Sequence, residues 1–223
     1  MKGIIFRDVN VIELADLPDP TCQPDEVVLK VATCGICGTD LHVSKGEYIE
    51  KYPIIPGHEF SGTIVEVGRD VNHLKVGDRV TADPNVFCGY CEYCRNEQAN
   101  HCSNWHGMGV NRDGAFAEYV NVPARNCYFV PENLTDSEAA FIEPLACVAY
   151  SMRRLRVWPG DKILIFGAGP MGLLLLQALK KYGSSQVVVV EKIANRLEIA
   201  KQLGCSQAII AGPDQSDALK GTF

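Results

Sequence analysis

The chain has 223 residues, of which 47% are hydrophobic and 22% charged, a composition typical of a globular protein with one large domain or two ordinary ones. Its 27 acidic residues outnumber 21 basic ones, and with a formal net charge of −6 and no long apolar run we expect neither nucleic acid nor membrane as a partner. Residues 1–8 contain no signal-peptide core, so ten cysteines indicate a reducing, cytoplasmic location and metal ligation rather than a disulfide framework.

The first part of the chain, residues 1–145, has the pattern of a β domain. Short runs rich in β-branched residues occur at 26–32, 60–67, 78–82 and 117–122. Turn signals such as Gly77-Asp78 separate these runs. We therefore predict a barrel-like β domain with long functional loops, and we place it at residues 1–150.

Two segments of this domain carry metal-ligating side chains in a loop context. Residues 34–42 include Cys37, and residues 57–62 include His58. A catalytic zinc uses three protein ligands and keeps one position open, and Cys37 and His58 are the natural first pair. Lone cysteines and histidines are more often structural, so neither segment is decisive alone.

Four cysteines then occur within fifteen residues, in the spacing C-x2-C-x2-C-x7-C: Cys88, Cys91, Cys94 and Cys102. Four thiolates at this spacing can converge on one tetrahedral ion, and zinc is the first choice. Gly89 permits the tight backbone turn that such a knuckle needs. An iron–sulfur cluster and buried or disulfide-bonded cysteines are the alternatives.

The pattern changes after residue 151. Apolar runs at 162–166 and 186–190 predict buried strands, and 207–210 predicts a third. Between them, residues 171–182 and 194–203 predict helices that end at Gly183 and Gly204. This β-α-β-α-β order indicates an α/β domain with a parallel, doubly wound sheet at residues 151–223.

A glycine-rich stretch, G-x-G-x-x-G, follows the first of these strands and opens the first helix, the context that a dinucleotide-binding turn requires. The residues expected to contact the cofactor there are Gly167, Gly169, Pro170, Met171 and Gly172. Glu191 ends the second strand, where an acidic residue would bind a ribose hydroxyl and favour NAD. Lys192 and Arg196 lie close enough to keep NADP as an alternative.

Together these motifs resemble the zinc-containing medium-chain dehydrogenase/reductase family. The stretch from Gly57 to Val71 matches the zinc signature G-H-E-x2-G-x5-G-x2-V of that family, and the cysteine spacing at 88–102 matches its structural zinc lobe. Gly-Asp-Arg-Val at 77–80 fits as well. The resemblance covers nearly the whole chain. It implies a GroES-like catalytic β-barrel followed by a Rossmann domain, with two zinc ions per chain.

The resemblance also suggests roles for further residues. Glu143-Pro144-Leu145 resembles the glutamate version of the third zinc ligand, as in sorbitol and threonine dehydrogenases, and Cys147 is the alternative. Glu59 resembles a residue that ligates the metal directly or through water. Asp40 resembles the carboxylate that orients the histidine ligand, here His58.

The implied reaction is hydride transfer between an alcohol and NAD. Thr39 resembles the hydroxyl that passes the substrate proton outward, and His42 resembles a later station of that relay. We rank a polyol or secondary alcohol, oxidised to a ketone or ketose, as the first substrate class and L-threonine as the second. A zinc-binding relative that has lost catalysis is the alternative from another class.

The C-terminal region accounts for only the first half of a Rossmann domain, because it has three predicted strands where a full sheet has six. We therefore expect a C-terminally truncated chain, and activity of the 223-residue piece itself is left open. For the full-length protein, the resemblance implies a homo-oligomer, either a dimer or a tetramer.

Overall fold

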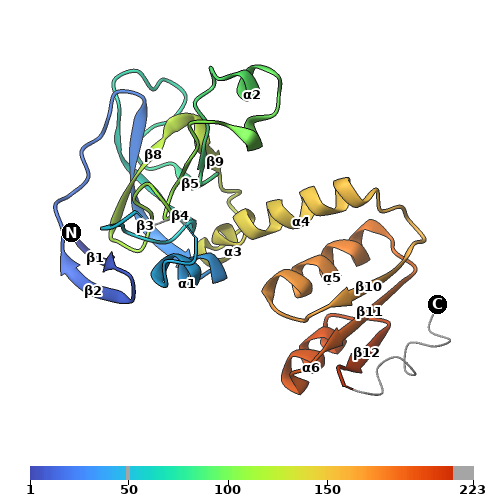
Figure 1. Ribbon diagram of the computed structural model, residues 1–223. Helices are drawn as coiled ribbons and strands as arrows, with labels where there is room; N and C mark the ends of the chain where they lie inside the picture. Colours follow the sequence, from blue (N-terminus) through green and yellow to red (C-terminus); the bar gives the residue numbers. More distant parts are fainter. Residues whose placement is uncertain (49–50, 213–223) are drawn as a thin grey trace. The chain divides into compact units, whose positions relative to one another are not determined.

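A five-stranded antiparallel sheet is the centre of the N-terminal part of the chain (Figure 1). In this computed structural model, which describes residues 1–48 and 51–212, the order across the sheet is β8-β3-β4-β5-β9. The strands are β3 (Glu26–Gly35), β4 (Glu59–Val67), β5 (Arg79–Ala82), β8 (Tyr119–Pro123) and β9 (Cys127–Phe129). Each of the four β-branched runs found in the sequence overlaps one of these strands, so the predicted β domain is confirmed.

The pairing of β3 with β4 positions the loops of interest. The two strands are antiparallel, so the end of β3 lies beside the start of β4, with Gly35 opposite Glu59. The register shifts between Val31 and Thr33, which marks a β-bulge just before this end. Leu29 of β3 and Phe60 of β4 are fully buried in the core. The loops that carry Cys37 and His58 therefore leave the sheet at the same place.

Short elements surround this sheet, and the sequence analysis did not identify them. They are the hairpin β1 (Lys2–Asp8) and β2 (Val11–Asp16), the pair β6 (Asn85–Val86) and β7 (His106–Gly107), the helices α1 (Gly38–Ser44), α2 (Glu92–Arg95) and α3 (Asp136–Ala140), and the 3-10 turns Ala99–His101 and Ala124–Asn126. Most are too short to show a hydrophobic period. All but one residue of β2 are exposed, so that strand lacks the alternating pattern of a half-buried strand.

The C-terminal part is a three-stranded parallel sheet in the order β10-β11-β12. Its elements in sequence are β10 (Lys162–Phe166), α5 (Pro170–Tyr182), β11 (Gln186–Glu191), α6 (Ala194–Gln202) and β12 (Gln207–Ile210). The predicted β-α-β-α-β order is confirmed. Gly183 ends α5 in the left-handed conformation, with φ of 97°, as its place after the helix indicated.

One face of this sheet is packed against both helices. Leu176 and Leu179 of α5 and Leu197 of α6 join Val187 and Val189 in a buried cluster. Side chains of the opposite face, including those of Val188 and Val190, form a separate small cluster. Because consecutive residues of a strand point to opposite faces, the unbroken valine run of β11 supplies both clusters.

Compactness divides the chain into two units, residues 1–143 and 144–223. The division falls within α4 (Ile142–Leu155), a helix that the sequence analysis missed. The boundary expected at residue 150 is also inside this helix, and it stays a prediction. In the described residues no helix combines the length and apolar character needed to cross a membrane.

Candidate functional site

Three potential metal ligands from the two loops meet at the junction of β3 and β4. Cys37 comes directly before α1, while His58 and Glu59 lead into β4. The ligand atoms of these three residues all lie within 4.8 Å of one another. They are largely withdrawn from solvent, with His58 only 8% exposed. Residues more than twenty positions apart in sequence thus form one compact cluster.

This donor set fits a zinc ion. Zinc–ligand bonds of 2.0–2.3 Å place tetrahedral ligands about 3.3–3.8 Å apart, a spacing compatible with the observed convergence. A hydrogen bond with His58 lowers the pKa of the Cys37 thiol, which favours the thiolate that a metal binds. Burial alone would lower the pKa of His58, but its interactions with the neighbouring Asp40 carboxylate and Cys37 thiol raise it to about 10.

Asp40 connects both loops. Its Oδ2 accepts a hydrogen bond of 2.8 Å from the backbone N–H of Cys37, which completes a capping box at the start of α1. Its Oδ1 accepts one of 3.2 Å from the N–H of Gly57 and lies 3.4 Å from Nδ1 of His58. The last distance is too long for a good hydrogen bond, and Nδ1 has no other partner. Asp40, only 2% exposed, is placed to orient the imidazole.

Gly35 makes room for the Glu59 side chain, a role that the sequence analysis did not assign. A Cβ atom at residue 35 would lie 2.5 Å from Oε2 of Glu59, closer than atoms can approach. The sequence signal was present, because Gly35 lies in the segment 34–42 that carries Cys37, but only strand pairing puts it opposite Glu59. The missing side chain lets the carboxylate lie against the sheet beside the other ligands.

Glu143, in the first turn of α4, belongs to the same unit but not to the three-ligand cluster. Burial raises the pKa of its carboxyl group. The positive charge of His58 opposes that shift and the negative charge of Glu59 adds to it, so Glu143 is within electrostatic reach of both. Cys147 is exposed and belongs to neither ligand cluster found among the described residues.

The two proposed relay residues are both on α1. Oγ1 of Thr39 lies 3.6 Å from Sγ of Cys37, next to the ligand cluster. His42 is exposed, and its Nδ1 lies 2.8 Å from a carboxylate oxygen of Glu47. Residues three apart lie on the same face of a helix, so α1 presents Thr39 toward the cluster and His42 toward solvent along one side.

The four cysteines of the second motif also converge. The sulfur atoms of Cys88 and Cys94 are 3.9 Å apart, and those of Cys91 and Cys102 are 4.0 Å apart. These distances exclude disulfide bonds, whose length is about 2.05 Å, and approach the 3.8 Å expected around a zinc ion with bonds of about 2.3 Å. Gly89 makes the turn between the first two cysteines with φ of 80°.

The glycine-rich turn joins β10 to α5 and is built mainly by backbone contacts. Gly167 has φ of 97°, and its N–H donates to the carbonyl of Val190 over 2.7 Å. A Cβ at Gly172 would lie 2.0 Å from the carbonyl oxygen of Gly167. At Gly169 the nearest atom would be Nη1 of Arg196, 3.9 Å away. Gly172 is thus needed for packing, whereas Gly169 leaves open space above the start of α5.

The side chain of Glu191 is hydrogen-bonded to the glycine-rich turn. This role could not be inferred from its position at the end of β11. One carboxylate oxygen accepts a hydrogen bond of 2.8 Å from Ala168 N–H, and the other accepts from the N–H groups of Lys192 and Ile193. These bonds lower the pKa of Glu191. Nη1 of Arg196 lies 3.8 Å from the carboxylate of Glu191, so the two residues form an ion pair next to the glycine-rich turn.

Comparisons with known proteins agree with these motifs. Residues 23–132 match the alcohol dehydrogenase GroES-like domain. The chain is 40% identical over 212 residues to D-arabinitol dehydrogenase 1 of Uromyces fabae, covering 95% of this chain and 59% of that protein. It is 39% identical over 202 residues to L-threonine 3-dehydrogenase of Legionella pneumophila, covering 89% and 59%.

A solved structure gives the same result for the fold. An alcohol dehydrogenase of Escherichia coli CFT073, complexed with the cofactor NADH, superposes with a TM-score of 0.93 and is 37% identical. The alignment covers 100% of this chain and 66% of that one. The chain therefore spans about six-tenths of the length of the two relatives named above and two-thirds of the solved structure.

Proposed function

Since the chain belongs to the zinc-containing medium-chain dehydrogenases/reductases, among the alcohol and polyol dehydrogenases, we propose that it provides the metal centre and part of the dinucleotide site of an oxidoreductase. The reaction is hydride transfer between NAD and a polyol or secondary alcohol, giving a ketone or ketose. The observation that supports this most strongly is the convergence of Cys37, His58 and Glu59 apart from the four-cysteine cluster.

The proposed catalytic metal is a zinc ion held by Cys37, His58 and Glu143, with Glu59 as a direct or water-mediated ligand. A zinc at an open site supplies Lewis acidity, which lowers the pKa of a coordinated hydroxyl group. Asp40 faces Nδ1 of His58 and so leaves Nε2 for the metal. Glu143 stands outside the tight cluster, and it has the burial and proximity to His58 expected of a ligand that completes the site.

The substrate proton is proposed to leave along α1. Thr39 lies at the inner end of this path, beside Cys37, and its hydroxyl can accept one proton while donating another. His42 lies at the outer, exposed end, where an imidazole nitrogen can accept a proton and release it to water. The path from the metal site to solvent is then less than two turns of helix long.

The second zinc is proposed to be structural and bound by Cys88, Cys91, Cys94 and Cys102. All four positions of a tetrahedral ion are then taken by protein sulfur, so no position is open to substrate. Such a site contributes to folding, because the metal binds the folded loop and not the unfolded chain. Two zinc ions per chain are therefore expected.

NAD is the proposed redox cofactor. Its pyrophosphate would lie over Gly167, Gly169 and the start of α5 at Pro170 and Met171, because the N-terminal end of a helix favours an anion, although Pro170 itself has no N–H to donate. The carboxylate of Glu191 is fixed by three backbone amides and would repel a 2′-phosphate. Arg196 offsets part of this charge, so NADP is the less favoured cofactor.

Two alternatives remain as proposals of lower rank. The Legionella relative is named an L-threonine 3-dehydrogenase, and the same metal centre could act on the secondary hydroxyl of L-threonine. A zinc-binding relative without catalysis would need only the four-cysteine site. The three-ligand cluster favours an enzyme, because a purely structural protein gains nothing from an open metal site.

The first experiment is metal analysis of the purified chain, combined with dinucleotide binding. We expect two zinc ions per chain, one of which is lost in Cys37→Ser, and tighter binding of NADH than of NADPH. A substrate panel of polyols, simple alcohols and L-threonine then ranks the substrates by NADH formation. One zinc per chain, unaffected by Cys37→Ser, would support the non-catalytic alternative and contradict the proposal.

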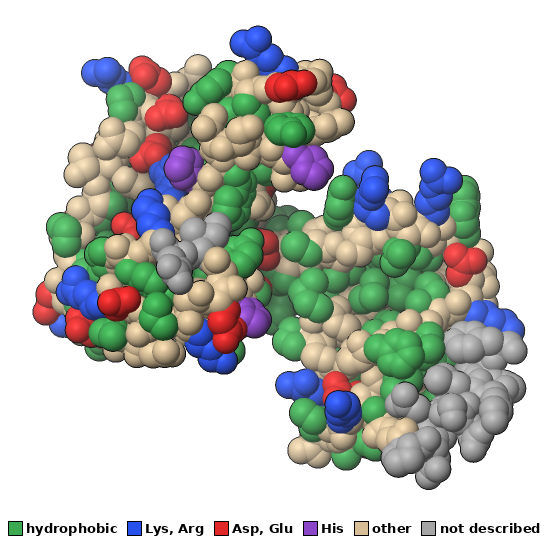
Figure 2. All heavy atoms as spheres, in the orientation of Figure 1, with side chains coloured by type: hydrophobic (Ala, Val, Ile, Leu, Met, Phe, Trp, Pro, Cys, Tyr) green, Lys and Arg blue, Asp and Glu red, His purple; other side chains and the backbone are tan. Residues whose placement is uncertain are grey.

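The remaining proposals concern partners and location. Basic and acidic side chains are interspersed on the face shown in Figure 2, as expected for a protein whose partner is a small alcohol and not nucleic acid. A cytoplasmic homo-oligomer, dimer or tetramer, is the proposed state of the full-length protein. Sedimentation analysis tests the oligomer, and a monomer at micromolar concentration would contradict it.

A further inference from the structure

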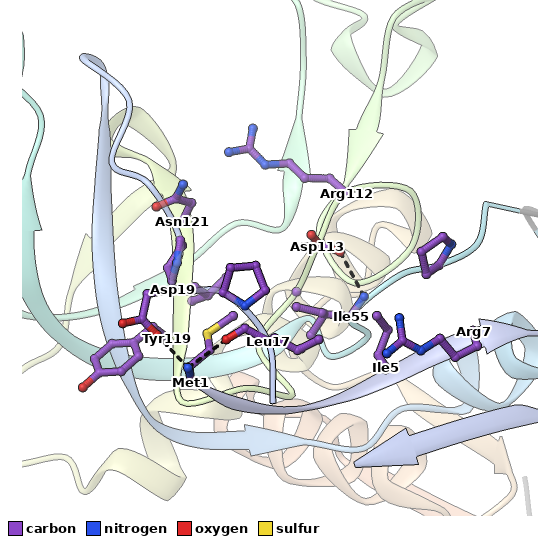
Figure 3. A pocket seen from close by; sticks show the side chains of 15 residues that line it. Met1, Ile5, Arg7, Leu17, Asp19, Ile55, Arg112, Asp113, Tyr119 and Asn121 are labelled. Carbon is purple, nitrogen blue, oxygen red and sulfur yellow. Dashed lines mark hydrogen bonds and ion pairs between the residues drawn. The ribbon is translucent and has the colours of Figure 1, made fainter. Parts of the chain in front are cut away.

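A turn at residues 107–114 packs on the backbone directly before His58. The three carbonyl groups of residues 55–57 accept hydrogen bonds of 2.7–2.9 Å from N–H groups at the end of this turn and just after it. In return, Oδ1 of Asp113 accepts a hydrogen bond of 3.0 Å from the N–H of Ile55, drawn as a dashed line in Figure 3. The segment that leads into His58 is therefore hydrogen-bonded to the turn along its whole length.

The two backbones approach closely because glycines meet there. A Cβ at Gly109 would lie 2.7 Å from the carbonyl oxygen of Gly57, and one at Gly114 would lie 2.2 Å from the same oxygen. Gly57 is equally confined, since a Cβ on it would lie 2.5 Å from a ring carbon of Phe116. Main chain thus touches main chain, and no flexible side chain lies between Gly57 and the turn to absorb a displacement.

The turn is itself held in place. The carbonyl of Gly107 accepts hydrogen bonds of 3.0–3.1 Å from the N–H groups of residues 110–112. Met108 is fully buried in the core of the five-stranded sheet, and Val110 belongs to a second buried cluster that includes Val43 of α1. The turn is thus fixed by its own hydrogen bonds and by burial at two points.

The Gly57 peptide links the turn to the imidazole of His58. The carbonyl of Gly57 accepts the hydrogen bond from residue 115, and its N–H donates to Oδ1 of Asp40 over 3.2 Å. The same Oδ1 lies 3.4 Å from Nδ1 of His58. Because Gly57 directly precedes His58, a displacement of Gly57 moves both the imidazole and the carboxylate that orients it.

We propose that the 107–114 turn positions His58 for metal binding, with Gly109 and Asp113 as positioning residues. This role rests on the proposed function, in which Cys37 and His58 bind the catalytic metal. A methyl group at residue 109 has to move away from Gly57 by about 0.5 Å to reach an ordinary contact, and this displacement is as large as the tolerance of a preorganised metal site.

The test is the zinc affinity of the purified 223-residue chain, measured by competition with a chelator. Gly109→Ala should weaken binding at the Cys37 site about tenfold and leave the four-cysteine site unchanged. Gly77→Ala is the matched control. Both glycines have positive φ, of 75° and 95°, so alanine strains either turn, but a Cβ at residue 77 meets no atom within 4 Å. The control should lower Tm without changing the zinc affinity.

Cobalt in place of zinc gives a readout that a loss of stability alone would not change. The absorption bands of Co²⁺ depend on the type and geometry of its ligands, and the bands that are lost in Cys37→Ser belong to the candidate catalytic site. Gly109→Ala should shift or weaken these bands, whereas Gly77→Ala should keep the wild-type spectrum.

A second pair of variants keeps the test valid if Gly109→Ala does not fold. Asp113→Ala removes the acceptor of the Ile55 N–H, whereas Asp113→Asn keeps an oxygen acceptor there. We expect about fivefold weaker zinc binding at the Cys37 site for Asp113→Ala and wild-type affinity for Asp113→Asn. Because both variants lose the negative charge, attraction between that charge and the metal cannot explain a difference.

Three results would contradict this role of the turn. The first is an unchanged zinc affinity and cobalt spectrum in Gly109→Ala. The second is that Gly77→Ala weakens zinc binding as much, which would make backbone strain the cause. The third is that Asp113→Asn weakens it as much as Asp113→Ala. A wild-type chain without a zinc that Cys37→Ser removes would instead contradict the proposed function, and this role with it, so the two failures are distinguishable.

Discussion

Gly172 and Gly169 belong to the same glycine-rich turn, yet the structure predicts opposite consequences for replacing them with alanine. A Cβ at residue 172 would lie 2.0 Å from the carbonyl oxygen of Gly167, about 1 Å inside the closest contact that real structures show. Forcing the helix and the turn apart costs roughly 3 kcal/mol, and the better helix propensity of alanine returns about 1 kcal/mol. We expect a net loss of about 2 kcal/mol.

Thermal unfolding followed by circular dichroism measures this loss. For a unit of the size of residues 144–223, a change of about 2 kcal/mol corresponds to a decrease in Tm of roughly 10 °C. Gly169→Ala is the matched control, because the nearest atom to its Cβ is 3.9 Å away and its φ is −73°. Its stability should change by less than about 1 kcal/mol, while NADH binding weakens because the methyl group occupies the space proposed for the pyrophosphate.

The two variants together test whether Gly172 is needed for packing and whether the space at Gly169 holds the cofactor. If Gly172→Ala unfolds at the wild-type temperature, the close approach of α5 to the turn is not a packing requirement. If Gly169→Ala loses as much stability as Gly172→Ala and still binds NADH like the wild type, the assignment of the open space to the cofactor is wrong.

The remaining predictions concern the metal sites and Glu191. Cys94→Ser should remove one zinc per chain and lower Tm, whereas Cys37→Ser should remove the other zinc with little loss of Tm; metal analysis and calorimetry distinguish them, and the reverse pattern would mean that the two sites have been exchanged. Gly35→Ala should displace the Glu59 carboxylate and weaken zinc binding at the Cys37 site, while circular dichroism shows an unchanged fold. Unchanged zinc affinity would contradict the role of Gly35 in making room for the Glu59 side chain. Backbone hydrogen bonds lower the pKa of Glu191 in the folded state, so its stabilising effect is present above its ordinary pKa of 4.5 and is lost as the pH falls through the lower folded value. Glu191→Gln should therefore lower Tm at pH 7 but not once the pH is below that folded value, and a constant difference would refute the linkage.

The C-terminal unit shows how far local patterns lead. Strand runs, a glycine turn and Gly183 after a helix are each encoded within a few neighbouring residues, and the structure confirmed the β-α-β-α-β order from them. The helix α4 was missed, and the domain boundary was placed at residue 150, within it.

In the N-terminal unit the sequence indicated the candidate ligand side chains but not the neighbouring residues that position them. Cys37 and His58 could be selected by residue type and by motif. The role of Gly35 could not, because it depends on strand register, which places that glycine opposite Glu59.

The sequence by itself indicated the family, the β and α/β halves, and the candidate residues for binding zinc and a dinucleotide, because motif spacing and hydrophobic period are local properties. Tertiary structure decided which of these residues meet. It brought Cys37, His58 and Glu59 within 4.8 Å of one another and left Glu143 outside that cluster. Distances between remote residues follow from strand pairing and from side-chain packing, and no local pattern contains them.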